Sequence, residues 1–318
     1  MAATVLGVGE TMVRLMPGQG ETLESAPAYA VSVGGAESNV CMDLAALGVK
    51  TAWVSRLPRN PLGRRIAAVI RSTGVDIDGV VWAAEGRAGV YLVQPAVSPR
   101  SGEVHYYRHD SAFTKIDPDS VNWDVLNGVR VIHLTGITPA LSPEAHRLVK
   151  RVILEGSQRH NMMSFDVNYR AQLWSPTAAR EVLEPLVQGL DVVIVSNRDA
   201  ATVFGERGEP AAVAQALRLR FRCRTLVLTL GAAGAFALDE SGAAQQPAYS
   251  AEIVDRIGRG DAFTAGFLYG YLQHGTGEGL RYGTALAALK QTYMGDVFYG
   301  TLADVEAILH GDAGGLRR

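Results

Sequence analysis

Short apolar runs and longer segments alternate along residues 129–230. Each apolar run has the length of a buried strand, and each longer segment predicts a helix. A strand followed by a helix and then by another strand predicts parallel strands with crossover helices. We therefore expect a doubly wound α/β fold, in which helices cover both faces of a mostly parallel sheet. The predicted strands are 129–134, 162–167, 191–196 and 225–230, and the predicted helices are 143–156, 177–188 and 210–221.

The N-terminal part of the chain predicts more of this sheet and a second, smaller one. Residues 11–33 are divided by prolines and glycines into short alternating pieces, and residues 80–112 alternate again. We expect strands from these two ranges to form the small sheet, and residues 1–318 to be a single domain. The other predicted elements are strands 5–9 and 51–55 and helices 38–47 and 62–72.

A glycine motif precedes an apolar helix predicted at 262–272. Gly258 and Gly260 flank one residue, and Asp261 follows directly. A glycine turn that leads into a helix leaves backbone N–H groups without partners, and the helix dipole adds partial positive charge. Such a turn binds anions, most often phosphates, and the Asp261 carboxylate could serve as a general base. The alternative is a tight turn with an acidic residue beside the helix N-terminus.

Further polar residues follow predicted strands, at the edge where open parallel sheets bind ligands. Gly34 and Gly35 permit close backbone approach, and Asn39 offers a donor and an acceptor for a sugar hydroxyl. Arg108 and Arg170 could each clamp a carboxylate or a phosphate. The alternatives are a capped turn for the glycines and surface salt bridges for the arginines.

Two more strand ends suggest a nucleotide and a metal. The turn from Thr229 to Gly234 could pass close to a nucleotide, or could simply connect two strands. Asp199, which follows a strand together with Ser196, could hold a metal through water or could cap a helix.

Composition and charge exclude several classes of function. The formal net charge is −2 and the chain has no basic run, so no nucleic-acid partner is expected. No stretch reaches the roughly 18 uninterrupted apolar residues of a membrane span, and the N-terminus lacks the features of a signal peptide. The two cysteines, Cys41 and Cys223, lie far apart, which argues against a disulfide framework. We therefore expect a cytoplasmic protein without a membrane partner.

Several motifs together resemble those of a known family. Gly-Gly-Ala-Glu-Ser-Asn at 34–39 and Gly-Arg-Gly-Asp-Ala-Phe at 258–263 resemble the ribokinase-like carbohydrate kinases of the phosphofructokinase-B type. Tyr-Tyr-Arg at 106–108 and Asp-Val-Asn-Tyr-Arg at 166–170 are similar to narrower patterns of the 2-keto-3-deoxygluconate kinases. The similarity extends from about residue 5 to about residue 310.

The resemblance implies an activity and a set of site residues. These kinases transfer a phosphoryl group from ATP, with Mg²⁺, to the 6-hydroxyl of the sugar acid; a need for a monovalent cation stays open. A β-sheet lid, here from about 11–33 and 80–112, covers the site and often joins copies into a dimer or larger homo-oligomer. Asp261 would be the catalytic base, and Gly258 and Gly260 would hold the transferring group. The sugar acid would contact Gly34, Gly35, Ala36, Glu37, Ser38, Asn39, Tyr91, Tyr106, Tyr107, Arg108, Arg170 and Asp296. ATP would contact Asn168, Ser196, Thr229, Gly231, Gly234, Arg259 and Gly260, and the metal would bind Asp199 through water.

The chain departs from the family pattern at two places. Arg259 stands where the family commonly has alanine, and it either faces solvent or adds charge near the ATP phosphates. Ser196 and Asp199 replace the asparagine and glutamate of a metal-linked motif. The alternatives to a 2-keto-3-deoxygluconate kinase are a fructokinase, a ribokinase, a keto-deoxygalactonate kinase or a non-catalytic sugar-acid sensor. A neutral sugar does not need two arginines, which favours an acid substrate.

Overall fold

The computed structural model describes residues 2–97 and 99–311, which are built around one large sheet. Among these residues the sheet has nine strands, in the order β13-β12-β11-β10-β9-β8-β1-β4-β5. The strands from β11 to β5 run parallel to their neighbours, and the β12–β13 hairpin adds two antiparallel strands at one edge. The strands are β1 (Val5–Val8), β4 (Thr51–Pro58), β5 (Val80–Ala83), β8 (Val131–Thr135), β9 (Met162–Asp166), β10 (Val192–Ser196), β11 (Thr225–Thr229), β12 (Ala235–Asp239) and β13 (Gly242–Gln246).

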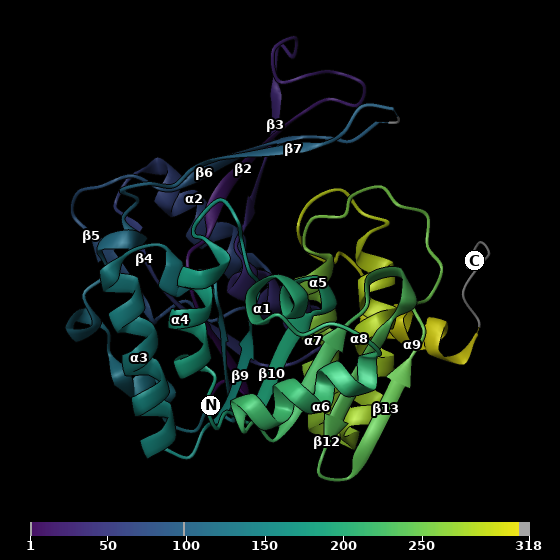
Figure 1. Cartoon of the computed structure of the whole chain (residues 1–318). Coiled ribbons are helices and arrows are strands. Elements are labelled where there is room, and N and C mark those ends of the chain that lie inside the picture. The colour runs from purple at the N-terminus through teal and green to yellow at the C-terminus, as the bar shows by residue number, and fades with distance from the viewer. Residues whose placement is uncertain (1, 98, 312–318) are drawn as a thin grey trace.

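Helices cover both faces of the large sheet (Figure 1). Successive side chains of a strand point to opposite faces, and in a central strand such as β10 the side chains on both faces are apolar. Val193 of β10 packs in one cluster with Leu148 of α3, while Ile194 packs in a second cluster with Phe267 of α7. Strands that are buried on both faces read as continuous apolar runs, which is how β10 and β11 appear in the sequence. The helices are α1 (Ala36–Ala46), α2 (Pro61–Ser72), α3 (Pro143–Gln158), α4 (Pro176–Leu186), α5 (Asn197–Asp199), α6 (Pro210–Phe221), α7 (Arg259–His274), α8 (Thr276–Lys290) and α9 (Leu302–His310).

A second sheet, which we call the lid, has four strands in the order β3-β2-β6-β7. It lies at the top of Figure 1, above the ends of the parallel strands. Met12, Tyr91 and Val93 form a small apolar cluster on it, whereas β7 is mostly exposed. The lid strands are β2 (Met12–Pro17), β3 (Tyr29–Gly34), β6 (Val90–Gln94) and β7 (Glu103–Tyr107).

The predicted fold class is confirmed, and strands from both predicted ranges form the small sheet. Each strand and helix predicted between 129 and 230 is present, and its ends shift by two residues at most. Residues 80–83, however, do not join the lid: β5 pairs with β4 in the large sheet, with Ser55 opposite Val80. Within the range 80–112 the lid strands are β6 and β7.

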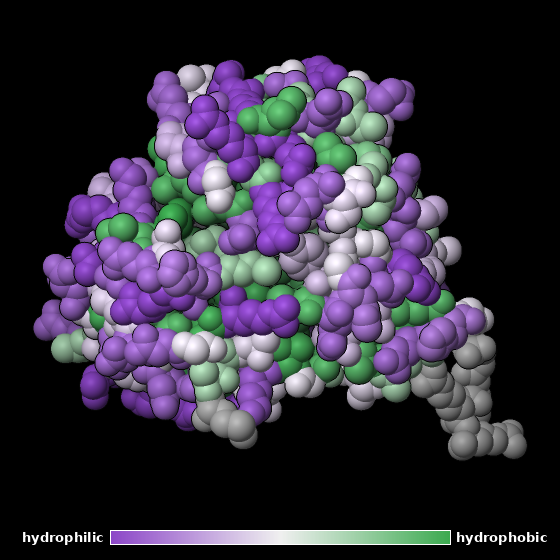
Figure 2. Space-filling model, turned by 90° about the horizontal axis from the view of Figure 1, so that it is seen from below, coloured by the Kyte–Doolittle hydropathy of each residue, from purple (hydrophilic) through white to green (hydrophobic). Residues whose placement is uncertain are grey.

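The face opposite the lid is a mosaic of hydrophilic side chains with smaller apolar areas between them (Figure 2). Scattered apolar residues of this kind are normal on the surface of a folded protein. Within the described residues, no helix has the length and hydropathy to cross a membrane.

His133 lies on β8 in the interior of the large sheet and is fully buried. Its Nδ1 is 3.1 Å from the Oγ of Ser164, and its Nε2 has no partner among the described residues. Burial lowers the pKa of His133 from 6.5 to about 3, so the imidazole is neutral in the folded chain.

This histidine should make the free energy of unfolding depend on pH. Below pH 6.5 the unfolded chain takes up a proton that the folded chain does not, so His133 lowers stability by about 1.4 kcal/mol per pH unit as the pH falls. The effect ends near pH 3, where the folded imidazole is also protonated. Urea denaturation at about pH 7 and about pH 5 should show a weaker pH dependence for His133→Gln than for the wild type. Equal dependence in the two proteins would contradict this assignment.

Candidate active site

A large cleft lies between the lid and the carboxyl ends of the parallel strands. Its volume is about 1520 Å³, more than the roughly 300–1,000 Å³ that suits one small ligand. Its walls come from the lid, from residues that follow β1, β9, β10 and β11, and from the start of α7. Two substrates can therefore bind side by side, at the edge of the sheet that the sequence predicted.

The glycine motif forms the start of α7 at the wall of the cleft. Gly258 has a φ of 78°, and a Cβ on it would lie 1.8 Å from the backbone oxygen of Asp296. Gly260 borders open space, because a Cβ there would have no other atom within 4 Å. Only glycine therefore fits at 258, while the space beside Gly260 is available to a ligand.

Backbone donors at this turn are available to an anion. The N–H groups of Arg259 and Ala262 bind the carbonyl oxygens of Arg256 and Gly258. The N–H groups of Gly260 and Asp261 lie in the first turn, where an α-helix offers no partner, and among the described residues no bond from outside the helix reaches them. We call the segment 258–261 the anion loop.

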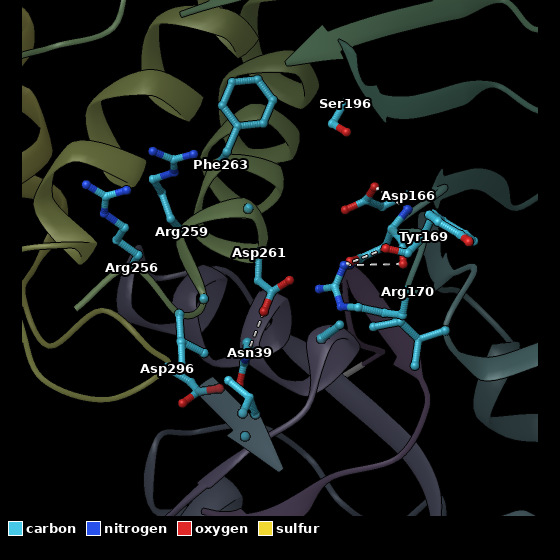
Figure 3. Close-up of a pocket in the computed structure, with 18 of the residues that line it drawn as sticks. Asn39, Asp166, Tyr169, Arg170, Ser196, Arg256, Arg259, Asp261, Phe263 and Asp296 are labelled. Carbon is cyan, nitrogen blue, oxygen red and sulfur yellow. Dashed lines mark hydrogen bonds between the residues drawn. The ribbon is translucent and has the colours of Figure 1, made fainter. Parts of the chain in front are cut away.

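Asp261 lies at this loop, is half-buried and points into the cleft (Figure 3). The Nδ2 of Asn39 donates to its Oδ2 at 2.7 Å, and the Oδ1 of Asn39 accepts from the Gly35 N–H at 3.2 Å. These bonds orient the Asn39 amide and leave Oδ1 of Asp261 for a substrate hydroxyl. Asn39, which the sequence assigned to the sugar, lines the cleft and holds this carboxylate.

The surroundings of Asp261 set its protonation. Burial raises its pKa from 3.8 to about 6, although the bond from Asn39 and the charge of Arg170 oppose the rise. The carboxylate is therefore ionised at neutral pH, as the sequence predicted. Its pKa nevertheless lies much closer to neutral pH than a helix N-terminus alone would place it. A general base is most effective when its pKa lies near the working pH.

Lid residues line the end of the cleft nearest to β6 and β7. The rings of Tyr91 and Tyr106 stack with centroids 5.8 Å apart, and the Tyr91 hydroxyl donates to Oδ2 of Asp296 at 2.7 Å. Arg108 is paired with Glu10, with its Nη2 2.6 Å and its Nε 2.8 Å from Oε2 of Glu10. One edge of the Arg108 guanidinium thus remains for a ligand. The predicted sugar residues Gly34, Gly35, Ala36, Glu37 and Tyr107 also line the cleft.

Two residues of the 34–39 motif make contacts inside the protein. Oε1 of the buried Glu37 accepts from the hydroxyls of Thr135 at 2.8 Å and Thr138 at 2.7 Å. Ser38 is fully buried, accepts from the Thr11 hydroxyl at 2.6 Å and is not part of the cleft wall. The prediction that Ser38 contacts the substrate is therefore wrong, since its hydroxyl fixes the start of α1 instead.

Acidic residues gather on the opposite wall, at the ends of β9 and β10. Burial raises the pKa of Asp166 to about 8, and the charges of Asp261 and Asp199 contribute to the rise. Burial also raises the pKa of Asp199, whose Oδ2 accepts from the Tyr169 N–H at 3.3 Å. Arg170 is the nearby cation: its Nη1 donates to the backbone oxygen of Tyr169 at 3.1 Å, and in Figure 3 it faces Asp261.

This wall fits a magnesium ion that arrives with phosphates. Within the described part of the chain, no three His, Cys, Asp or Glu residues are grouped to hold a metal by themselves. Mg²⁺ usually keeps several waters and binds one or two carboxylates together with substrate phosphates. Asp166 and Asp199 supply two such carboxylates at the wall of the cleft. Ser196 is the cap of α5, because its Oγ accepts from the Asp199 N–H at 3.0 Å.

The residues predicted to contact ATP also border the cleft. Arg259 is half-buried, and its side chain forms no hydrogen bond or ion pair with any described residue. In Figure 3 it lies beside Arg256, on the side of the anion loop away from Asp166. The others on this wall are Asn168, Ser196, Thr229, Gly231, Gly234 and Gly260.

Sequence reasoning missed a buried ion-pair network behind the anion loop. Arg14 of β2 is 1% exposed and contacts Oδ2 of Asp255 at 2.5 Å and Oδ1 of Asp296 at 2.6 Å. The buried Lys290 donates from its Nζ to the backbone oxygen of Asp255 at 3.1 Å. One signal was available in the sequence: a single arginine, Arg14, stands inside the apolar run Met-Val-Arg-Leu-Met. A charged side chain in a buried strand needs a charged partner.

Comparison with known proteins decides the family. Residues 2–299 match the sequence profile of the pfkB family of carbohydrate kinases, which is nearly the whole chain. The chain belongs to this family. The resemblance seen in the sequence is thereby confirmed, and the α/β sheet with a separate lid is the fold that this carbohydrate kinase shares with its relatives.

Three relatives illustrate the similarity. The kinase is 37% identical to a 2-dehydro-3-deoxygalactonokinase of Haloferax volcanii over 100% of both chains. It superposes with a TM-score of 0.92 on the crystal structure of a 2-dehydro-3-deoxygluconokinase of Thermotoga maritima, at 28% identity and covering 98% of this chain and 99% of that one. A putative ribokinase II from E. coli, solved with ATP and Mg²⁺, has the same fold, with a TM-score of 0.88, 19% identity and coverage of 97% and 99%.

Alanine at the two glycines of the anion loop should have opposite effects in this kinase. Gly260→Ala should fold with a melting temperature at or above that of the wild type, because the methyl group has room and alanine favours a helix by about 1 kcal/mol. Its kcat/KM should fall at least about tenfold, because the methyl group enters the space beside the anion donors. Thermal melting and steady-state kinetics measure both effects.

Gly258→Ala is the matched variant. Its methyl group would overlap the Asp296 backbone at a positive φ, so the free energy of unfolding should fall by about 1–3 kcal/mol or more. Full activity of Gly260→Ala, or native stability of Gly258→Ala, would contradict the geometry of the loop.

Proposed function

We propose that this kinase transfers the γ-phosphoryl group of ATP to the 6-hydroxyl of 2-keto-3-deoxygluconate. The products are 2-keto-3-deoxy-6-phosphogluconate and ADP. One observation carries the proposal: Asp261 stands at the anion loop with one oxygen held by Asn39, in the same cleft as Arg108 and Arg170. A base beside an anion-binding turn is what phosphoryl transfer to a hydroxyl needs, and arginines favour an acid substrate.

The residues of the cleft divide the reaction between them. Oδ1 of Asp261 accepts the proton of the 6-hydroxyl while the oxygen forms its bond to the γ-phosphorus. The bond from that phosphorus to the bridging oxygen breaks, and the electron pair leaves with ADP. The N–H groups of Gly260 and Asp261 stabilise the charge on the transferring group. The charge of Arg170 opposes the rise in the pKa of Asp261 and so helps to keep this base ionised.

ATP and Mg²⁺ form the donor side of the proposal. The kinase shares its fold with a protein whose structure was solved with ATP and Mg²⁺. Asp166 and Asp199 would suit a hydrated Mg²⁺ ion that binds together with the phosphates. Bound Mg²⁺ supplies charge neutralisation for the phosphates.

The acid end of the substrate is assigned to the arginines of the cleft. Among the described residues, Arg170 donates only to backbone oxygens, and its charge also acts on the nearby carboxylates of Asp166 and Asp261. Arg108 shares its charge with Glu10 and offers one remaining edge. The C4 epimer, 2-keto-3-deoxygalactonate, is the second candidate, since the Haloferax volcanii relative carries that name.

We also propose that copies of the kinase associate through the lid. Val31 and Tyr107 of the lid are 42% and 60% exposed, and apolar side chains on a sheet face favour association. We further propose that the kinase is located in the cytoplasm.

Replacing the base tests the mechanism. Asp261→Asn keeps the size of the side chain but cannot accept the proton, so kcat should fall by about 10²–10⁴ with unchanged folding. Near-native turnover by Asp261→Asn would contradict the assignment of the base.

The pH dependence follows from the same carboxylate. Because Asp261 acts in its ionised form and burial raises its pKa to about 6, kcat/KM should be level above that pH and fall about tenfold per unit below it. A profile that stays level down to the usual aspartate range would contradict this expectation.

Release of ADP with a panel of sugars tests the substrate. With ATP and Mg²⁺ we expect turnover of the two epimeric keto-deoxy acids and little turnover of fructose or ribose. The ratio of kcat/KM for the two acids decides the epimer. Turnover of a neutral sugar alone would overturn the acid assignment, and binding of an acid without turnover would favour a sensor.

A further inference from the structure

Arg14 is a deeply buried cation that the proposed reaction does not use. It lies on the lid strand β2, is 1% exposed and does not line the cleft. Its two terminal nitrogens bind different carboxylates, Nη2 to Asp255 at 2.5 Å and Nη1 to Asp296 at 2.6 Å. Burial by itself would lower the pKa of Arg14, but the charges of Asp296 and Asp255 raise it, so the guanidinium stays charged.

Both carboxylates belong to segments that shape the anion loop. Oδ1 of Asp255 accepts from the Ile257 N–H at 3.0 Å, one residue before Gly258. Oδ2 of Asp255 also accepts from the Gly295 N–H at 3.1 Å, which joins the segment before the loop to the segment that carries Asp296. The backbone oxygen of Asp296 in turn packs on Gly258. The position of the loop therefore depends on the network that Arg14 centres.

Asp296 also reaches the lid side of the cleft. Its Oδ2 accepts from the Tyr91 hydroxyl at 2.7 Å, and a Cβ on Gly34 would lie 2.3 Å from that same oxygen. Tyr91 and Gly34 line the cleft where the sugar is proposed to bind. One guanidinium thus connects the lid with the loop that holds the transferring group.

We propose that Arg14 is a positioning residue that sets the distance between the bound sugar and the anion loop. It acts through Asp255 and Asp296 and touches neither substrate. The inference rests on the proposed function, because it takes the lid end of the cleft as the sugar site. The planar fork of arginine can hold two carboxylates in fixed directions, whereas the single ammonium of lysine cannot. A displacement of about 1 Å between reacting groups can cost about a hundredfold in rate.

Arg14→Lys is the first test, because it keeps the buried charge and removes the fork. We expect kcat to fall at least about tenfold while the KM values for ATP and sugar change much less. The control is Arg65→Met: Arg65 is exposed and also contacts the lid, through the backbone oxygen of Val31 at 3.1 Å, and its loss should leave kcat unchanged. The ratio to wild type is measured on whichever sugar the wild type phosphorylates, so a wrong substrate assignment does not affect it.

A second variant keeps the proposal testable if Arg14→Lys folds poorly. Arg14→Ala removes the side chain, and free guanidinium ion can enter the space and meet the two carboxylates. Guanidinium at concentrations below those that denature should restore kcat, and sodium at equal ionic strength should not. Wild-type kcat in Arg14→Lys would overturn the proposal. Guanidinium that restores the melting temperature of Arg14→Ala but not its kcat would also overturn it, since Arg14 would then act in folding alone.

Discussion

The contact between Gly258 and the backbone of Asp296 fixes the place where this kinase can bind a phosphate. Because no side chain fits at 258, the loop packs directly on the segment that carries Asp296, and α7 starts at a defined point. Because α7 starts there, Asp261 lies opposite Asn39 of α1, and the N–H groups of the first turn of α7 lie at the wall of the cleft. Backbone packing thus positions the chemistry, and the side chains adjust its electrostatics.

Burial determines those electrostatics. The region around α1 and α7 holds several carboxylates whose pKa values burial raises, including Glu37, Asp43 and Asp166. Two internal cations lie among them, Arg14 and Lys290, and burial lowers the pKa of the latter. A site with this balance binds a polyphosphate best when the ligand brings its own cation, which is consistent with Mg²⁺ as a companion of the donor.

The sequence predicted what depends on periodicity and on local motifs. The order of strands and helices from 129 to 230 follows from apolar patterns, and the anion loop follows from Gly258, Gly260 and Asp261. The pairing of β5 with β4 in the large sheet was not predicted, because pairing partners are not local. Ser38 was misassigned because a hydroxyl inside a ligand-binding motif can equally bond within the protein.

Contacts between distant segments were beyond sequence reasoning for the same physical cause. Arg14 and Asp296 are 282 residues apart, and Glu10 and Arg108 are 98 apart, so no spacing rule connects them. The second pair changes the substrate argument, because Glu10 compensates part of the charge that the sequence assigned to an acid. Among the described residues Arg170 donates only to backbone oxygens, but its charge also acts on Asp166 and Asp261.

The most direct test of this account is a crystal structure with the keto-deoxy sugar acid and a non-hydrolysable ATP analogue. It should place the 6-hydroxyl oxygen about 3 Å from Oδ1 of Asp261, with the γ-phosphate on the N–H groups of the anion loop and the carboxylate on Arg108 or Arg170. A sugar bound with its 6-hydroxyl away from Asp261, or a γ-phosphate away from Gly260, would contradict the account.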